Sequence, residues 1–86
     1  MQMTTKQAVQ IAKTWVFETF VGEDIRDVGL EEVRISDRNW NITIGFSRPW
    51  QKVFNPIAVN LNNERSYKIL TIDDTSGDVI EMRNRE

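Results

Sequence analysis

The sequence contains neither cysteine nor histidine. Their absence excludes disulfide bonds, thiolate nucleophiles, zinc sites built on these residues, and every mechanism that needs an imidazole. No apolar run approaches the roughly 20 residues of a membrane helix. The first residues also lack the charged start and apolar stretch of a signal peptide, so we expect none. A chain without disulfides fits a reducing compartment, and we expect a cytoplasmic protein with no membrane partner.

The composition indicates one small globular domain. The chain has 86 residues, of which 40% are hydrophobic and 28% are charged, and its net charge is −2. Such a chain has enough apolar residues for a modest core. Its near-zero net charge argues against binding nucleic acid through bulk electrostatics. We therefore expect a single domain over residues 1–86, either a complete small protein or a domain cut from a longer one.

Residues 4–21 have the pattern of an amphipathic helix. Thr4 and Gln7 match the capping box, in which each side chain binds a free backbone N–H of the other residue. From Ala8 to Phe20, apolar residues recur at helical spacing. Gly22 follows directly, and we expect it to end the helix with a left-handed backbone.

After Gly29 the hydrophobic period changes from about 3.6 to 2, which is typical of strands. The alternation is strict from Trp40 to Phe46, where every second residue is apolar. Asp74 to Gly77 forms a turn motif, with glycine where a positive φ is needed. We expect strands at 31–36, 39–47, 57–61, 65–73 and 78–83. The predicted fold class is α+β, with one N-terminal helix packed on an antiparallel four- to five-stranded meander sheet.

The segment from 48 to 55, with the sequence RPWQKVFN, is unusually apolar for a loop. Aromatic rings framed by basic residues are typical of protein interfaces. The strand at 65–73 is apolar on both faces, so we expect its second face to be covered by this loop, a second copy of the chain or a partner protein. The loop either packs on this face or is exposed to a partner. The candidate partner-binding residues are Arg48, Trp50, Lys52, Phe54, Tyr67 and Ile69.

Three segments resemble known families. TTKQAVQIAK (4–13) and YKILTIDDTSGDVIEM (67–82) are similar to the two ends of a PepSY domain, which has a cystatin-like fold. With NWNITI (39–44) added, the same outline resembles small bacterial immunity proteins of the nuclear-transport-factor-like fold. The resemblance implies a helix on an antiparallel sheet and a protein that binds or restrains a partner. It implies no catalytic residues.

Two more specific functional interpretations, an inhibitory loop and a calcium loop, are less well supported than structural explanations of the same residues. QKVFN (51–55) and the dipeptide Pro49-Trp50 resemble the inhibitory loops of cystatins, but they occur in the wrong order along the chain. Asp73, Asp74 and Asp78 could suggest a calcium loop. Their spacing is too short for one, and a hairpin turn explains them. We therefore expect no metal and no cofactor.

Enzymatic activity and nucleic-acid binding are two further interpretations of the sequence. The carboxylates of Glu18, Glu23, Asp24 and Asp73 form no recognisable catalytic pair, so we expect no enzyme. Basic residues interleaved with aromatic ones between 34 and 68 suggest a single-stranded nucleic-acid binder as a third interpretation. They are Arg34, Arg38, Arg48, Lys52, Arg65 and Lys68, with Trp40, Trp50, Phe54 and Tyr67.

The sequence thus predicts a non-catalytic protein-binding module. Its most concrete form is a small bacterial inhibitor or immunity-type protein that occludes a partner protein. The alternative is an accessory or dimerisation domain, which could form a homodimer through the open sheet face.

Overall fold

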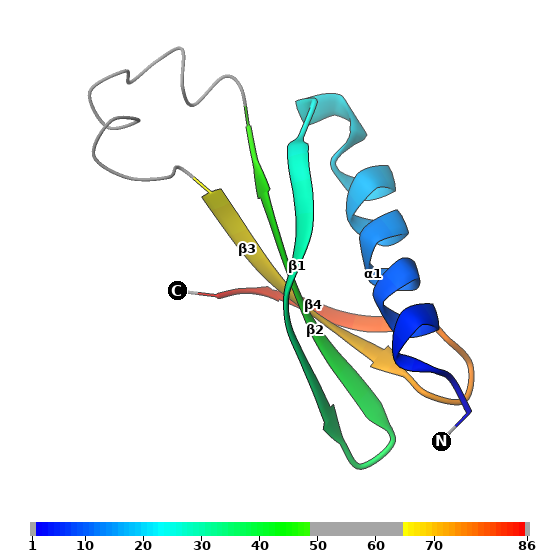
Figure 1. The fold of residues 1–86 in the computed structure, drawn as a ribbon. Coiled ribbons are helices and arrows are strands. Elements are labelled where there is room, and N and C mark those ends of the chain that lie inside the picture. Colours follow the sequence, from blue (N-terminus) through cyan, green and yellow to red (C-terminus); the bar gives the residue numbers. More distant parts are fainter. Residues whose placement is uncertain (1, 49–64, 86) are drawn as a thin grey trace.

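A computed structural model describes residues 2–48 and 65–85 of the chain. Trp50, Lys52, Phe54 and the expected strand at 57–61 lie outside the described residues. Figure 1 shows a helix that packs on one face of a sheet. In chain order, the elements are α1 (Thr5–Thr19), a 3-10 turn η1 (Val21–Glu23), β1 (Arg26–Ser36), β2 (Asn39–Ser47), β3 (Arg65–Asp73) and β4 (Val79–Asn84).

The capping box forms as the sequence predicts. The Thr4 hydroxyl accepts a hydrogen bond from the Gln7 backbone N–H, and the Gln7 side chain accepts one from the Thr4 N–H. The end of the helix differs from the prediction, because α1 stops at Thr19 and Gly22 lies inside η1. The left-handed backbone occurs at Asp24 instead, with φ of 50°. Aspartate tolerates this conformation better than most residues do.

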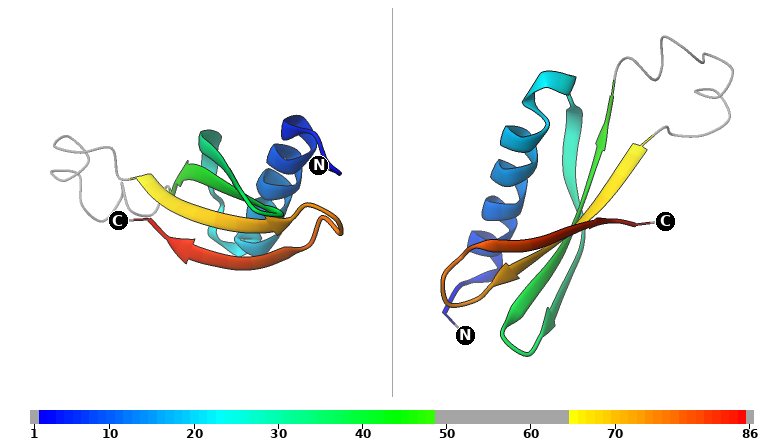
Figure 2. Two further views of the ribbon diagram at one scale, coloured as in Figure 1. Left: turned by 90° about the horizontal axis from the view of Figure 1, so that it is seen from below. Right: turned by 180° about the vertical axis from the view of Figure 1, so that it is seen from behind.

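Within the described residues, the sheet has the strand order β1-β2-β3-β4, and all its neighbours are antiparallel. This confirms the predicted α+β arrangement of one helix on an antiparallel sheet. Two further views show that α1 lies on one side only, and that no described element covers the other face (Figure 2). We call this uncovered side the open face.

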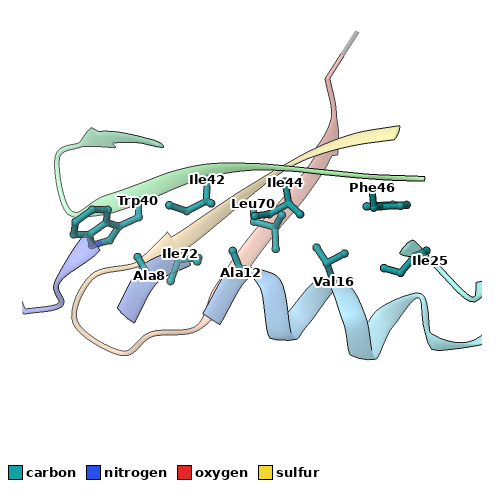
Figure 3. Close-up of a cluster of buried hydrophobic side chains, with 10 residues drawn as sticks. All are labelled: Ala8, Ala12, Val16, Ile25, Trp40, Ile42, Ile44, Phe46, Leu70 and Ile72. Carbon is teal, nitrogen blue, oxygen red and sulfur yellow. The ribbon is translucent and has the colours of Figure 1, made fainter. Parts of the chain in front are cut away.

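The core lies between α1 and the middle strands. Ala8, Ala12 and Val16 are fully buried on the helix, and their small side chains let it approach the sheet closely. Alternate residues of β2 and β3 fill the other side (Figure 3): Trp40, Ile42, Ile44, Phe46, Leu70 and Ile72. The strict alternation in β2 therefore marks a strand with one face in the core.

Both outer strands of this sheet are irregular. β1 begins at Arg26, five residues before its expected start at 31. Its register shifts between Arg26 and Gly29 and again between Leu30 and Glu32, so the period of two is broken there. β4 has a similar shift, because Val79 pairs with Ile72 while Glu81 pairs with Thr71.

The β3–β4 turn confirms the positive φ expected at its glycine, since Gly77 has φ of 78°. The turn is also a structural junction. The buried carboxylate of Asp74 accepts hydrogen bonds from the backbone N–H groups of Gln2 and Met3, at 2.6 and 3.0 Å. It accepts a further bond from the indole N–H of Trp40 at 2.8 Å. Asp74 thus ties the segment before α1 to β2 and to the turn.

Candidate protein-binding surface

The pairing of the strands determines which side chains share the open face. In an antiparallel pair, residues directly opposite each other point to the same side of the sheet. Because Trp40, Ile42 and Ile44 face the core, Asn41 and Thr43 face away from it. The residues paired with these two, and their same-face neighbours, form the open face: Glu32, Arg34, Asn41, Thr43, Gly45, Arg65, Tyr67, Ile69, Thr71, Glu81 and Arg83.

Tyr67 and Ile69 occupy the middle of this face, and both are half-buried. The Arg85 guanidinium lies over the Tyr67 ring, 4.4 Å from its centroid. The ring also leans over β2, because a Cβ added at Gly45 would lie only 3.0 Å from Tyr67 Cε1. The hydroxyl of Thr71 donates a hydrogen bond to Asn41 at 2.9 Å. The structure therefore places two of the predicted partner-binding residues side by side at the centre of an open surface.

Charged pairs line the two outer strands. On β1, Arg34 Nε lies 3.0 Å from the Glu32 carboxylate, and on β4 Arg83 Nη1 lies 3.1 Å from the Glu81 carboxylate. These four side chains are between 42% and 75% exposed, so each isolated pair adds little to stability. None of these four residues was among the predicted partner-binding residues, and Arg34 was predicted only as part of a nucleic-acid surface. The signal that could have found them is the opposite charge two positions apart in each strand, which places both partners on one face.

At the centre of the open face, the apolar side chains of Tyr67 and Ile69 lie beside the polar ones of Asn41, Thr43 and Thr71, and the periphery is charged. A further ion pair joins Arg65 to Glu31, with 3.6 Å between Nη2 and Oε2. A depression in this face is lined by Glu32, Arg34 and Arg83 of the outer strands and by Asn41, Thr43 and Ile69 of the inner ones. Arginines and glutamates of the neighbouring strands therefore surround Tyr67 and Ile69.

Arg48 lies on the other side of the sheet from Tyr67 and Ile69. Its guanidinium is 5.0 Å from the centroid of Phe46 and 5.6 Å from that of Phe20. It pairs with Glu23 and donates to the Ser66 hydroxyl, and its side chain is only 12% exposed. The structure therefore separates this predicted partner-binding residue from the other two described ones.

Lys68 shares the environment of Arg48 near the end of the helix. Its ammonium group lies 5.7 Å from the Phe20 centroid and donates to the Asn84 side chain. Burial lowers the pKa of Lys68 below its ordinary value, and the positive charge of Arg48 lowers it further. In this region Arg48 and Lys68 make cation–π contacts with aromatic rings. Such contacts occur in the packed interior of proteins as well as at binding sites.

The carboxylates of the β3–β4 turn have structural roles. The backbone N–H of Ser76 donates to Asp73 and is the main cause of its lowered pKa. The indole of Trp40 is the main cause of the lowered pKa of Asp74. Across residues 2–48 and 65–85, no group of three or more acidic residues is placed to hold a metal ion. No helix in this part of the chain is long and apolar enough to cross a membrane.

A shallow groove runs along the flank of α1 beside the β3–β4 turn. Its floor is formed by Ile11, Trp15 and Val79, which are half-buried, and its rim includes Glu18 and Asp78. These apolar side chains also pack against the main core. The groove therefore lies at the margin of the hydrophobic core.

Comparisons with known proteins identify no relative of this chain. No protein-family model, no curated protein and no solved structure matches the chain. The resemblance to PepSY domains, cystatins and immunity proteins therefore stays a prediction.

Proposed function

We propose that the chain is a non-catalytic protein-binding module and that its open face contacts the partner. The observation that carries this proposal is the position of Tyr67 and Ile69 at the centre of the face, surrounded by arginines and glutamates. Tyrosine and arginine are enriched at the energetically dominant positions of interfaces. An inhibitor or immunity-type protein would use such a face to occlude its partner.

The arrangement of the arginines supports this assignment physically. Arg65, whose side chain is 20% exposed, pairs with Glu31, and the Arg85 guanidinium lies over the Tyr67 ring. Side chains that are already ordered lose less conformational entropy when a partner binds. A partner that buries this face can therefore use planar guanidinium groups without first having to immobilise them.

Capture of partners from the native host, compared between variants, tests the proposal. Ile69→Glu places a charge in the centre of the open face. Val21→Glu is the matched control, because Val21 is 77% exposed and lies in η1, away from this face. We expect a protein captured by the wild type and by Val21→Glu to be lost with Ile69→Glu, at unchanged helix and sheet content by circular dichroism. Equal capture by all three proteins would refute the open face as the binding surface.

A further inference from the structure

After a two-fold rotation, the charged residues at the margins of the open face lie opposite residues of the opposite charge. Arg34 and Glu81 stand at opposite ends of one row across the sheet, which runs through Asn41 and Thr71. Glu32 and Arg83 stand at the ends of the next row, which runs through Thr43 and Ile69. Each row therefore has opposite charges at its two ends, and the order of the charges reverses from one row to the next.

We propose that the partner on the open face is a second copy of this chain, related by a two-fold axis parallel to the strands and passing between β2 and β3. This inference rests on the proposed function, since it uses the same face. The rotation places β1 of one copy opposite β4 of the other. Arg34 then faces Glu81 of the second copy, and Glu32 faces its Arg83. Every contact occurs twice, as in all isologous interfaces.

The shape of the face is compatible with this axis. The strands of the sheet are visibly twisted relative to one another (Figure 2). A regularly twisted sheet has a saddle shape, and a two-fold rotation about an axis along its central strands returns the same saddle. The two open faces can therefore follow each other, as stacked sheets do in aligned packing.

Two apolar side chains, Tyr67 and Ile69, lie at the centre of the contact and the margin is charged, as is usual at an interface. The Tyr67 ring leans toward β2, so it lies close to the proposed axis and meets Tyr67 of the second copy. Ile69 pairs with Thr43 in the sheet, so after rotation it lies over β2 of the second copy, where Thr43 is itself only 2% exposed. The ion pairs at both margins then surround this centre.

The size of the face sets the expected strength. Strands spaced about 4.8 Å apart and roughly 30 Å long give a face on the order of 500 Å² in each copy. The total buried area of about 1,000 Å² lies at the lower limit for specific interfaces. We therefore expect a weak dimer, with a dissociation constant in the micromolar range or above, that dissociates as salt screens the charges.

Exchange of charges within one strand isolates the contacts between copies. The variant E32R/R34E exchanges the charges on β1, and E81R/R83E exchanges those on β4. Each variant preserves the net charge and the ion pair within its own strand. Each one, however, places like charges opposite each other at both margins of the proposed dimer. The fourfold variant E32R/R34E/E81R/R83E restores opposite charges everywhere.

Sedimentation equilibrium at several protein and salt concentrations measures the result, with thermal melting as a check on folding. We expect each strand exchange to raise the dissociation constant on the order of 10- to 100-fold. The fourfold variant should return it to within a few-fold of the wild-type value. The ion pair within each strand is preserved in both double variants and in the fourfold variant. A recovery of the dissociation constant in the fourfold variant therefore requires contacts between copies.

Two results would overturn the inference. A wild type that stays monomeric up to millimolar concentration would exclude the dimer, while the capture experiment with Ile69→Glu would still decide whether the open face binds a different protein. A wild-type dimer that survives E32R/R34E would exclude this axis. If Ile69→Glu nevertheless dissociated that dimer, the open face would still be the interface. Only the proposed arrangement of the two copies would be wrong.

Discussion

The indole N–H of Trp40 donates a hydrogen bond to the carboxylate of Asp74, with 2.8 Å between Nε1 and Oδ1. Trp40 is 2% exposed and lies in β2, while Asp74 begins the β3–β4 turn. Since Asp74 also binds the backbone before α1, this bond connects the core strand to the start of the helix. The stability of the fold should depend on it.

Trp40→Phe keeps an aromatic ring in the core but removes the donor. We expect the melting temperature to fall by roughly 5–10 °C, because a charge-assisted hydrogen bond is lost and ring volume is removed. The same substitution in an Asp74→Asn background should cost less, since the acceptor is then no longer charged. Equal losses in both backgrounds, measured by thermal melting, would show that the ring volume alone matters.

Acid should destabilise the protein through the β3–β4 turn. Hydrogen bonds from Ser76 and Trp40 lower the pKa values of Asp73 and Asp74 in the folded chain. The unfolded chain takes up these protons near the ordinary aspartate pKa of about 3.9. Between that value and the lower folded pKa, the unfolded state binds more protons, so stability falls as the pH falls. From about pH 5 upward the contribution is fully present.

Urea unfolding between pH 2.5 and 6 measures this dependence. The wild type should lose stability steadily below about pH 4, whereas Asp74→Asn should start from a lower stability and lose less of it with acid. A variant with the same acid-induced loss as the wild type would contradict the role assigned to Asp74.

Gly45 and Gly29 face each other across β1 and β2 and provide a matched pair of substitutions. A Cβ at Gly45 would lie 2.9 Å from Arg65 Nη2 and 3.0 Å from both Glu31 Oε2 and Tyr67 Cε1, while one at Gly29 has nothing within 4 Å. Gly45→Ala must therefore displace these three side chains, at a cost of about 1 kcal/mol. Gly29→Ala should be neutral or slightly stabilising, because it restricts the unfolded chain.

Partner binding separates the two glycines more sharply than stability does. We expect Gly45→Ala to weaken binding at the open face, because the Tyr67 ring is displaced from its centre. Gly29→Ala should bind like the wild type. Titration calorimetry, or sedimentation if the partner is a second copy, gives the comparison, and equal affinities would argue against a role for the position of the ring.

Arg48 should contribute to stability through its packing. Arg48→Met keeps most of the side-chain volume but removes the guanidinium from Phe20, Phe46 and Glu23, and we expect it to lower the free energy of unfolding by about 1–3 kcal/mol. Arg48→Lys should fall in between, because an ammonium group cannot reproduce the planar contacts. Urea unfolding of both variants tests this order.

The same substitution should change Lys68. The charge of Arg48 is one cause of the lowered pKa of Lys68, although burial is the larger one. The pKa of Lys68 should therefore rise in Arg48→Met and stay close to its present value in Arg48→Lys. Nuclear magnetic resonance of the lysine side chain as a function of pH measures both, and an unchanged pKa in Arg48→Met would show that burial alone lowers it.

The regular parts of the fold could be predicted from the sequence because one physical pattern dominates each of them. β2 has strictly alternating residues since one of its faces is entirely in the core. The start of α1 follows from Thr4 and Gln7, and the turn at Gly77 follows from its need for positive φ. The first half of β1 was missed because its bulges break the alternation on which the prediction depends.

The candidate surface was only half predictable. The alternation in β3 placed Tyr67 and Ile69 on the face away from the core, as the structure has them. The arginines and glutamates around them come from other strands, and their convergence depends on a register that the sequence does not specify. Arg48 was assigned to the partner-binding set from its neighbours in sequence, but its side chain, directly after the end of β2, lies against Phe20 and Phe46.

The bulges in β1 and β4 also limit how copies of this protein can aggregate. A regular outer strand offers a row of free N–H and C=O groups, to which a strand of another molecule can add indefinitely. Both outer strands of the described sheet have shifted registers, and β1 contains a left-handed residue at Asp27. Continuous growth by strand addition is therefore impeded at both edges of the described sheet.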